Sequence, residues 1–138
     1  GEKYWRNYFK KIKDDLKKDG LAGIQVILIN NKSYQKYSKS VDFIQKYVFP
    51  GGMLPSQEKL NENYVNAGLI EINSHSFGKS YAKTLTIWHK EFLNSLSSIK
   101  KLGFDTKLER IFKYYFSYCK AGFNSEKIDV AQKIIKLS

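Results

Sequence analysis

A nearly continuous apolar run, GIQVILIN, occupies residues 23–30 and constrains the fold of this chain more than any other feature. Its short length and its β-branched residues favour a strand over a helix. Strands that are apolar at successive positions are typical of parallel sheets, in which helices cover both faces. We therefore expect residues 23–30 to form a strand that is buried on both faces.

Two further segments have the pattern of strands. Residues 69–74 partly alternate apolar and polar side chains, and residues 129–137 form a short tail rich in Ile and Val. A polar segment at residues 73–78 predicts bends. Three strands are few for a sheet covered by helices, so we expect the chain to form part of an α/β fold rather than all of it.

Apolar residues spaced three and four apart predict helices between these strands. The predicted helices cover residues 4–16, 34–48, 57–67, 81–99 and 108–123. Gly20, Gly68 and Gly103 follow three of them, as expected for residues that end helices. Ser56 is a suitable N-cap for the third helix. The alternation of helices and strands predicts a single, partial α/β domain over residues 1–138.

The chain is strongly basic, with 24 Lys and Arg residues against 13 Asp and Glu and a formal net charge of +11. Many lysines lie between apolar residues at helical spacing, and the simplest interpretation is a solvated helix face. The alternative is attraction to an anionic membrane or to nucleic acid. Only Arg6 and Arg110 are arginines, which disfavours sequence-specific base readout, and nucleic acid is not expected as a partner.

The sequence excludes several classes of site. Cys119 is the single cysteine, so an intramolecular disulfide framework and a Cys-rich zinc site are both excluded. It falls on the apolar stripe of its helix, which favours a small buried side chain over a nucleophile. His75 and His89 lack the spacing of a metal motif, so no metal site is predicted. His89 lies off the apolar stripe of its helix and is expected to be exposed.

Targeting signals and phosphate-binding loops are not apparent. No run of about 18 apolar residues predicts a transmembrane helix, and the first residues lack the apolar core of a secretory signal. We therefore expect a cytoplasmic protein. Gly51 and Gly52 lie between two prolines rather than at a strand-to-helix turn, so they do not form a phosphate loop. The residues alone thus indicate a basic α/β domain with no recognisable active site.

Four collinear segments nevertheless resemble one family. They are GEKYWRNYFKKIKDDLKKDG (1–20), DFIQKYVFPGGMLPS (42–56), HSFGKSYAKTLTIWHKEF (75–92) and YYFSYCKAGF (114–123). Together they resemble the C-terminal half of the cyclopropane-fatty-acyl-phospholipid synthases, a family that includes the mycolic acid cyclopropane synthases. The segments occur in the family's order and spacing and fill nearly the whole chain.

The resemblance implies a class I S-adenosylmethionine-dependent methyltransferase fold, which is Rossmann-like and whose sheet would be incomplete in this chain. In this family a methyl group is added to the double bond of an unsaturated phospholipid acyl chain. Loss of a proton from the resulting carbocation closes a cyclopropane ring, with bicarbonate as the base. Such a carbocation needs a dry pocket, for which aromatic walls are suited.

The resemblance also implies roles for particular residues. Tyr81 matches the tyrosine that hydrogen-bonds the bicarbonate, and Ile27 matches a residue whose backbone contacts the same anion. Gln25 occupies a position where better-known members have a histidine. A Gln amide can donate a hydrogen bond but cannot carry a positive charge, which leaves the product open between a ring and a methyl branch.

Four more residues match motif positions that would shape the acyl-substrate site: Phe49, Pro50, Gly52 and His75. The family's glycine-rich cofactor loop, its acidic ribose ligand and a bicarbonate-binding glutamate would all lie upstream of this chain. We therefore expect a C-terminal fragment that is inactive alone and does not bind S-adenosylmethionine by itself.

The expected partners are unsaturated phospholipid and an anionic membrane surface, bound peripherally, with a homodimer as one possible assembly. Two alternatives stay open. One is a methyltransferase of the same fold with a small-molecule acceptor. The other is a non-catalytic basic module that binds membrane or nucleic acid.

Overall fold

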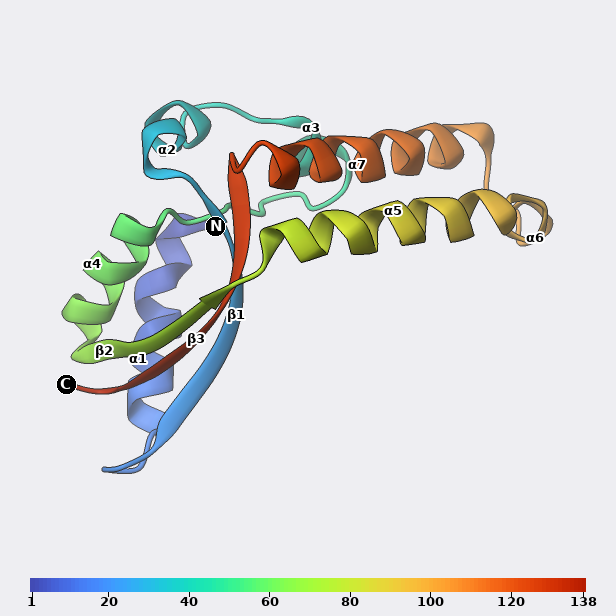
Figure 1. Ribbon diagram of the computed structural model, residues 1–138. Helices are drawn as coiled ribbons and strands as arrows, with labels where there is room; N and C mark the ends of the chain where they lie inside the picture. Colours follow the sequence, from blue (N-terminus) through green and yellow to red (C-terminus); the bar gives the residue numbers. More distant parts are fainter.

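The fold is a small twisted sheet with helices on both faces, as seen in a computed structural model that describes residues 1–138 (Figure 1). The elements, in chain order, are the 3-10 turn η1 (Glu2–Tyr4), α1 (Trp5–Asp15), β1 (Leu21–Ile29), α2 (Asn31–Tyr37), α3 (Phe43–Tyr47), α4 (Gln57–Ala67), β2 (Leu69–Ser76), α5 (Gly78–Asn94), α6 (Leu96–Lys101), α7 (Thr106–Asn124) and β3 (Ile128–Leu137). None of the helices combines the length and the apolar composition needed to cross a bilayer.

The sheet has the strand order β1-β3-β2, and β3 is antiparallel to both neighbours. The two outer strands therefore run parallel to each other without touching. All three predicted strands are confirmed, but the expectation of a doubly buried strand at residues 23–30 is wrong for this chain. β1 is an edge strand that pairs only with β3, and only Leu28 and Ile29 in it are fully buried.

One face of the sheet is closed by α1 and α4. Phe9 on α1 meets Tyr64 on α4 edge-to-face, with ring centroids 5.1 Å apart. Both rings belong to a core cluster with Leu28, Leu60, Leu69, Ala131 and Ile135. Ala22, Ile24 and Val26 of β1 also pack against this cluster, so the cover extends along most of the strand.

The other face is covered by α5 and α7, which lie side by side and project beyond the sheet (Figure 1). Their core cluster contains Ala82, Leu85, Phe116, Phe123 and Val130. Ile27 of β1 and Phe77, the residue after β2, pack against this cluster, and no other residue of β1 or β2 does so. The cover by α5 and α7 is therefore confined to the edge where the outer strands end.

The predicted helices are present, but some of them are divided into two shorter helices. The helix at residues 57–67 has the predicted bounds; Ser56 accepts a hydrogen bond from the Lys59 amide, and Gly68 ends it with a φ of 71°. The single helix expected at residues 34–48 is wrong, because the chain forms α2 and α3 with a turn between them. Asp42 starts α3 anew through a capping box with Gln45.

Two further boundaries differ from expectation. The segment at residues 73–78 is not a run of bends, because β2 continues to Ser76, where it still pairs with β3. The helix expected at residues 81–99 begins earlier, at Gly78, and is interrupted at Ser95 before α6. Gly103 follows α6 with a φ of 91°, a backbone conformation that glycine adopts at little cost.

Candidate functional site

An open hollow of about 730 Å³ lies at the edge of the sheet where β1 and β2 end and β3 begins. The ends of these strands and the first turns of α4 and α5 line it. Its lining includes Asn31, Gln57, His75, Phe77, Phe123 and Asp129. Ligands of open α/β sheets bind outside the carboxyl ends of the strands, so this edge is the candidate site.

Asp129 fixes the first turn of α5 at this edge. Its Oδ1 accepts a hydrogen bond from the Gly78 amide at 2.9 Å and another from the Val130 amide at 2.8 Å. A Cβ atom at position 78 would collide with the same carboxylate, so the close approach requires glycine. This contact ties α5 to β3 and sets the position of Tyr81 one turn later.

Tyr81 lies half-buried on α5 within a group of aromatic rings. Its ring centroid lies 5.2 Å from that of Phe123, 6.1 Å from that of Trp88 and 6.4 Å from that of Phe77. Burial, and after it the neighbouring Cys119 and Tyr81, raise the pKa of Tyr115. Tyr81 and Tyr115 both pack against the core cluster between α5 and α7.

Ile27 and Gln25 lie on the same side of the sheet as Tyr81. Ile27 is opposite Val130 and packs against the same core cluster as Tyr81. Gln25, two residues earlier in β1, is exposed, and its Oε1 accepts a hydrogen bond from Gln132 Nε2 at 3.2 Å. The Nε2 amide group of Gln25 takes no part in this bond.

His75 completes a polar row across the sheet. The strand registers place both Gln25 and His75 opposite Gln132. His75 is exposed, and its ring stacks on Phe77 at 5.8 Å. Nothing in the sequence singles out Gln132, because the row exists only once β3 lies between β1 and β2.

The segment with Phe49, Pro50 and Gly52 lies away from the hollow, beside α7. Phe49 is 57% exposed and meets Tyr115 edge-to-face at 6.4 Å. The Gly52 amide donates to the Phe49 carbonyl at 2.9 Å, and a Cβ at position 52 would lie 3.0 Å from that oxygen. Pro50 is exposed in the same turn. The structure therefore connects Phe49 to Tyr115 and leaves His75 at the hollow.

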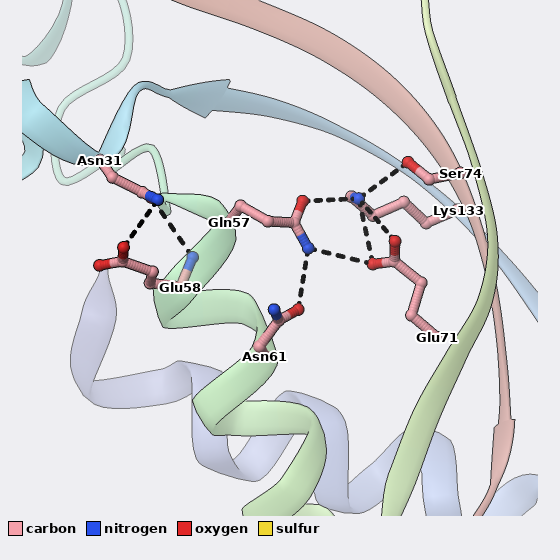
Figure 2. Close-up of polar contacts among 7 residues, drawn as sticks. All are labelled: Asn31, Gln57, Glu58, Asn61, Glu71, Ser74 and Lys133. Atoms are coloured by element: carbon pink, nitrogen blue, oxygen red, sulfur yellow. Dashed lines mark hydrogen bonds and ion pairs between the residues drawn. The ribbon is translucent and has the colours of Figure 1, made fainter.

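A buried lysine on the closed face was not predicted from the sequence. Lys133 is 1% exposed, and its Nζ donates to Gln57 Oε1 at 2.8 Å, to Ser74 Oγ at 3.0 Å and to Glu71 Oε2 at 3.0 Å (Figure 2). Gln57 Nε2 donates in turn to Asn61 at 2.8 Å. The one sequence signal is that Lys133 shares the strand parity of Ala131 and Ile135.

This network has a structural consequence at the site. Gln57 lines the hollow, and its amide orientation is set by Lys133 and Asn61. At the same edge Asn31 Nδ2 donates to Glu58 Oε1 at 2.9 Å (Figure 2). The polar side chains on this side of the hollow are thus held by one another, which leaves the exposed His75 as a freer group in its lining.

Two single-residue expectations have opposite outcomes. Burial raises the pKa of the Cys119 thiol to about 11, so the thiol stays neutral and fits a packing role rather than that of a nucleophile. His89 was expected to be exposed, which is wrong: it is half-buried and stacks on Phe116 at 5.4 Å. The neighbouring helix α7 covers a part of α5 that helical periodicity assigns to solvent.

The loops at this edge do not fit a dinucleotide-like cofactor. β1 is followed by Asn30 and Asn31 rather than by an acidic residue, and β2 is followed by Phe77. Gly78 is the one glycine at a strand-to-helix turn, and its amide already binds Asp129. We assign no residue of this chain to cofactor binding.

The sequence is similar to those of known methyltransferases and synthases. The chain is 32% identical over 133 residues to tuberculostearic acid methyltransferase UfaA1 of Mycobacterium tuberculosis, covering 96% of this chain and 31% of the relative. It is 29% identical to the cyclopropane-fatty-acyl-phospholipid synthase of Escherichia coli, covering 97% of this chain and 34% of the relative.

Solved structures agree on the fold. The cyclopropane synthase MmaA2 from Mycobacterium tuberculosis superposes with a TM-score of 0.86 at 21% identity, and the mycolic acid cyclopropane synthase CmaA1, complexed with SAH and CTAB, with 0.87 at 22%. Each superposition covers 98% of this chain and 50% of the other chain. The chain thus has the α/β fold of half of such a methyltransferase.

The family model for mycolic acid cyclopropane synthetase matches residues 1–133. This chain spans about a third of the length of the two sequence relatives and half of the two structures. The match is collinear with nearly every element described above, from η1 into β3. The chain belongs to the mycolic acid cyclopropane synthetase family.

Proposed function

We propose that this chain forms the acyl-binding part of an S-adenosylmethionine-dependent methyltransferase that acts on the double bond of unsaturated phospholipid acyl chains. The observation that carries the proposal is a set of four aromatic rings, Phe49, Phe77, Tyr81 and Tyr115, which we call the aromatic wall. Contacts between rings link Phe77 to Tyr81 and Tyr115 to Phe49, and Tyr81 and Tyr115 pack against the same core cluster.

The aromatic wall suits the chemistry of this family. S-adenosylmethionine, when bound, supplies the methyl group. Addition of a methyl cation equivalent to an alkene leaves one positive carbon on the acyl chain, which water would capture. Rings that exclude water and present electron-rich faces protect such a cation. The wall of this chain would therefore enclose the middle of the acyl chain.

The last step needs a base to remove one proton. Loss of a proton from the added methyl group, with its electron pair forming a bond to the positive carbon, closes a cyclopropane ring. The resemblance assigns the base to a bicarbonate held by Tyr81 and by the backbone of Ile27. The phenol of Tyr81 is a suitable donor to such an anion.

Gln25 distinguishes this chain within the proposal. Its Oε1 is occupied by Gln132, so its Nε2 remains a donor toward an anion on this side of the sheet. A neutral amide stabilises an anion less than an imidazolium does. We therefore leave the product open between a ring and a methyl branch, the latter requiring a separate reductant.

The experiment uses the whole product of the gene that encodes this chain. It is incubated with methyl-labelled S-adenosylmethionine and vesicles of unsaturated phospholipid, and the acyl chains are then analysed by mass spectrometry. A gain of CH4 indicates a saturated branch, whereas a gain of CH2 indicates a product that has lost a proton, and proton NMR of the acyl chains then distinguishes a cyclopropane ring from an unsaturated branch. Label in a soluble acceptor instead of lipid supports the small-molecule alternative, and vesicle binding without any transfer supports the non-catalytic module.

Tyr81→Phe tests the role of the phenol within the same assay. Removing one preorganised donor to a reacting anion lowers turnover by roughly 100-fold. Tyr8→Phe is the matched control, because Tyr8 is 53% exposed on α1, which covers the opposite face of the sheet. Equal turnover of the two variants would contradict the assignment of Tyr81.

A further inference from the structure

The loop between α6 and α7 places two large apolar side chains in solvent. Leu102 is 76% exposed and Phe104 is 50% exposed, with Gly103 between them at a φ of 91°. This loop lies at the end of the α5–α7 hairpin farthest from the sheet (Figure 1). Single exposed apolar residues are common, but two at the tip of a projecting element make a contact surface.

Basic residues surround this pair. Lys100 and Lys101 precede it, and Lys107 and Arg110 follow it. The two acidic residues nearby are already used: Asp105 caps α7 by accepting from the Leu108 amide at 2.9 Å, and Glu109 bridges two lysines. Lys101 and Lys107 have no such ion pair, so the tip presents positive charge beside apolar side chains.

The tip is held rigidly at the end of the hairpin. Glu109 lies 3.1 Å from Lys100 on α6 and 2.6 Å from Lys113 on α7. These lysines hold the pKa of Glu109 below its usual range, so the bridge stays charged at neutral pH. Behind the bridge, Phe92 stacks on Phe112 with centroids 5.6 Å apart. The apolar pair is therefore presented by packed helices.

Other exposed aromatic residues are partly explained by contacts within the chain. Tyr114 and Tyr118 on α7 pack against Phe43 of α3, with Phe43 and Tyr114 only 4.5 Å apart. Tyr118 also donates to Asp42 Oδ2 at 3.2 Å. Leu102 and Phe104 have no comparable neighbour, since neither packs against a core cluster.

We propose that the α6–α7 loop, residues Leu102–Phe104 with its flanking lysines, inserts into the interface of an anionic phospholipid bilayer. Apolar side chains that enter the acyl boundary beside lysines that meet the headgroups are the combination that interfacial binding requires. An apolar groove on a protein partner would leave the basic residues on both sides of the apolar pair unexplained. The inference rests on the proposed function, because it supplies the docking surface through which that enzyme reaches its acyl substrate.

The first test is co-sedimentation of the whole gene product with vesicles of phosphatidylcholine containing phosphatidylglycerol. The variant L102E/F104E is compared with L21E/V65E, which makes the same charge change at residues that are 61% and 75% exposed elsewhere. We expect the tip variant to bind at least roughly tenfold more weakly, because two large apolar side chains no longer leave water. The control variant should change binding by less than about threefold.

A second measurement reports insertion itself. The emission that Phe104→Trp adds to that of wild type, which contains Trp5 and Trp88, should be quenched by lipids brominated on the acyl chain, whereas the emission added by Val65→Trp should not. K101Q/K107Q should reduce vesicle binding by roughly fivefold per lysine and make it less sensitive to salt. Circular dichroism and thermal unfolding of each variant confirm that the fold is unchanged.

The outcomes separate this inference from the proposed function. Methyl transfer to phospholipid dispersed in detergent should be the same for wild type and L102E/F104E. Methyl transfer to phospholipid vesicles should be lower for L102E/F104E than for wild type. Equal binding losses in the tip and control variants, or no binding of the wild type, would overturn the inference. Binding that depends on the tip, without transfer to any acceptor, would overturn the proposed function but support membrane insertion by the α6–α7 loop.

Discussion

α1 and α4 cover one face of the sheet along most of its length, whereas α5 and α7 cover the other face only where the outer strands end. The closed face contains the larger core cluster, with Phe9, Leu69 and Ile135. On the partly open face, Gln25, Gln132 and His75 are exposed in a row. In the superposed structures half of each chain lies outside the match, so such an uncovered surface is expected of a partial fold.

The polar side chains of the two faces differ in how many hydrogen-bond partners they have. On the closed face Lys133 is buried with a full set of acceptors, because an unpaired charge there would destabilise the fold. On the open face Gln25 has one partner and His75 none but a stacked ring. Stability therefore resides mainly on the first face, and freedom to bind a ligand on the second.

The largest effect is expected from breaking the buried pair on the closed face. Glu71→Leu removes the carboxylate from Lys133 and leaves a buried charge without its counterion. Loss of one partner of a buried pair costs about 3–5 kcal/mol, and urea unfolding would measure it. Lys133→Met added to Glu71→Leu should recover most of this loss; a double variant as unstable as the single one would show that packing, not charge, dominates.

Gly78→Ala tests the junction between the faces. The new methyl group would collide with Asp129 and displace the first turn of α5, for which about 1–3 kcal/mol of destabilisation is expected. Transfer activity should fall as well, because Tyr81 lies one turn further along α5. Gly103→Asn, assayed on detergent-dispersed substrate, is the control, since no atom lies within 4 Å of a Cβ there and Asn tolerates positive φ. Equal activities of the two variants would contradict the positioning role of this turn.

Alkaline pH should weaken the packing of α7 through Cys119. Burial raises its pKa to about 11 in the folded chain, against 9.0 for a solvated thiol, so the unfolded chain releases the proton first. The resulting stabilisation is fully present below pH 9 and is lost as the pH rises toward 11. After allowance for partial exposure, about 1–2 kcal/mol is at stake. The difference between wild type and Cys119→Ala, followed by denaturant unfolding across this range, should shrink with pH; a constant difference would refute the shift.

The smallest effect on stability is expected from Gln25→His on the open face. Surface substitutions away from special features usually change the free energy of unfolding by under about 0.5 kcal/mol. The product is the sensitive readout, because an imidazole can become cationic beside the proposed anion site. We expect a higher fraction of ring product in the acyl-chain mass spectra. An unchanged product ratio would indicate that residue 25 does not act on the anion.

Local patterns in the sequence determined most individual elements. Ser56 and Gly68 bound α4 because a cap side chain and a left-handed glycine act within one turn. The strand at residues 23–30 followed from β-branched apolar residues in the same way. Asp42 shows the limit, since its capping box with Gln45 divides an apolar stripe that periodicity alone makes continuous.

Only the tertiary structure decided the pairing of strands and the surroundings of polar side chains. β3 lies between β1 and β2, so the run at residues 23–30 became an edge strand and Gln132 joined Gln25 to His75. Lys133 is buried because Gln57, Glu71 and Ser74 converge on it from segments more than fifty residues away in the chain. Such contacts depend on long-range register, which a periodicity of two or of 3.6 residues does not encode.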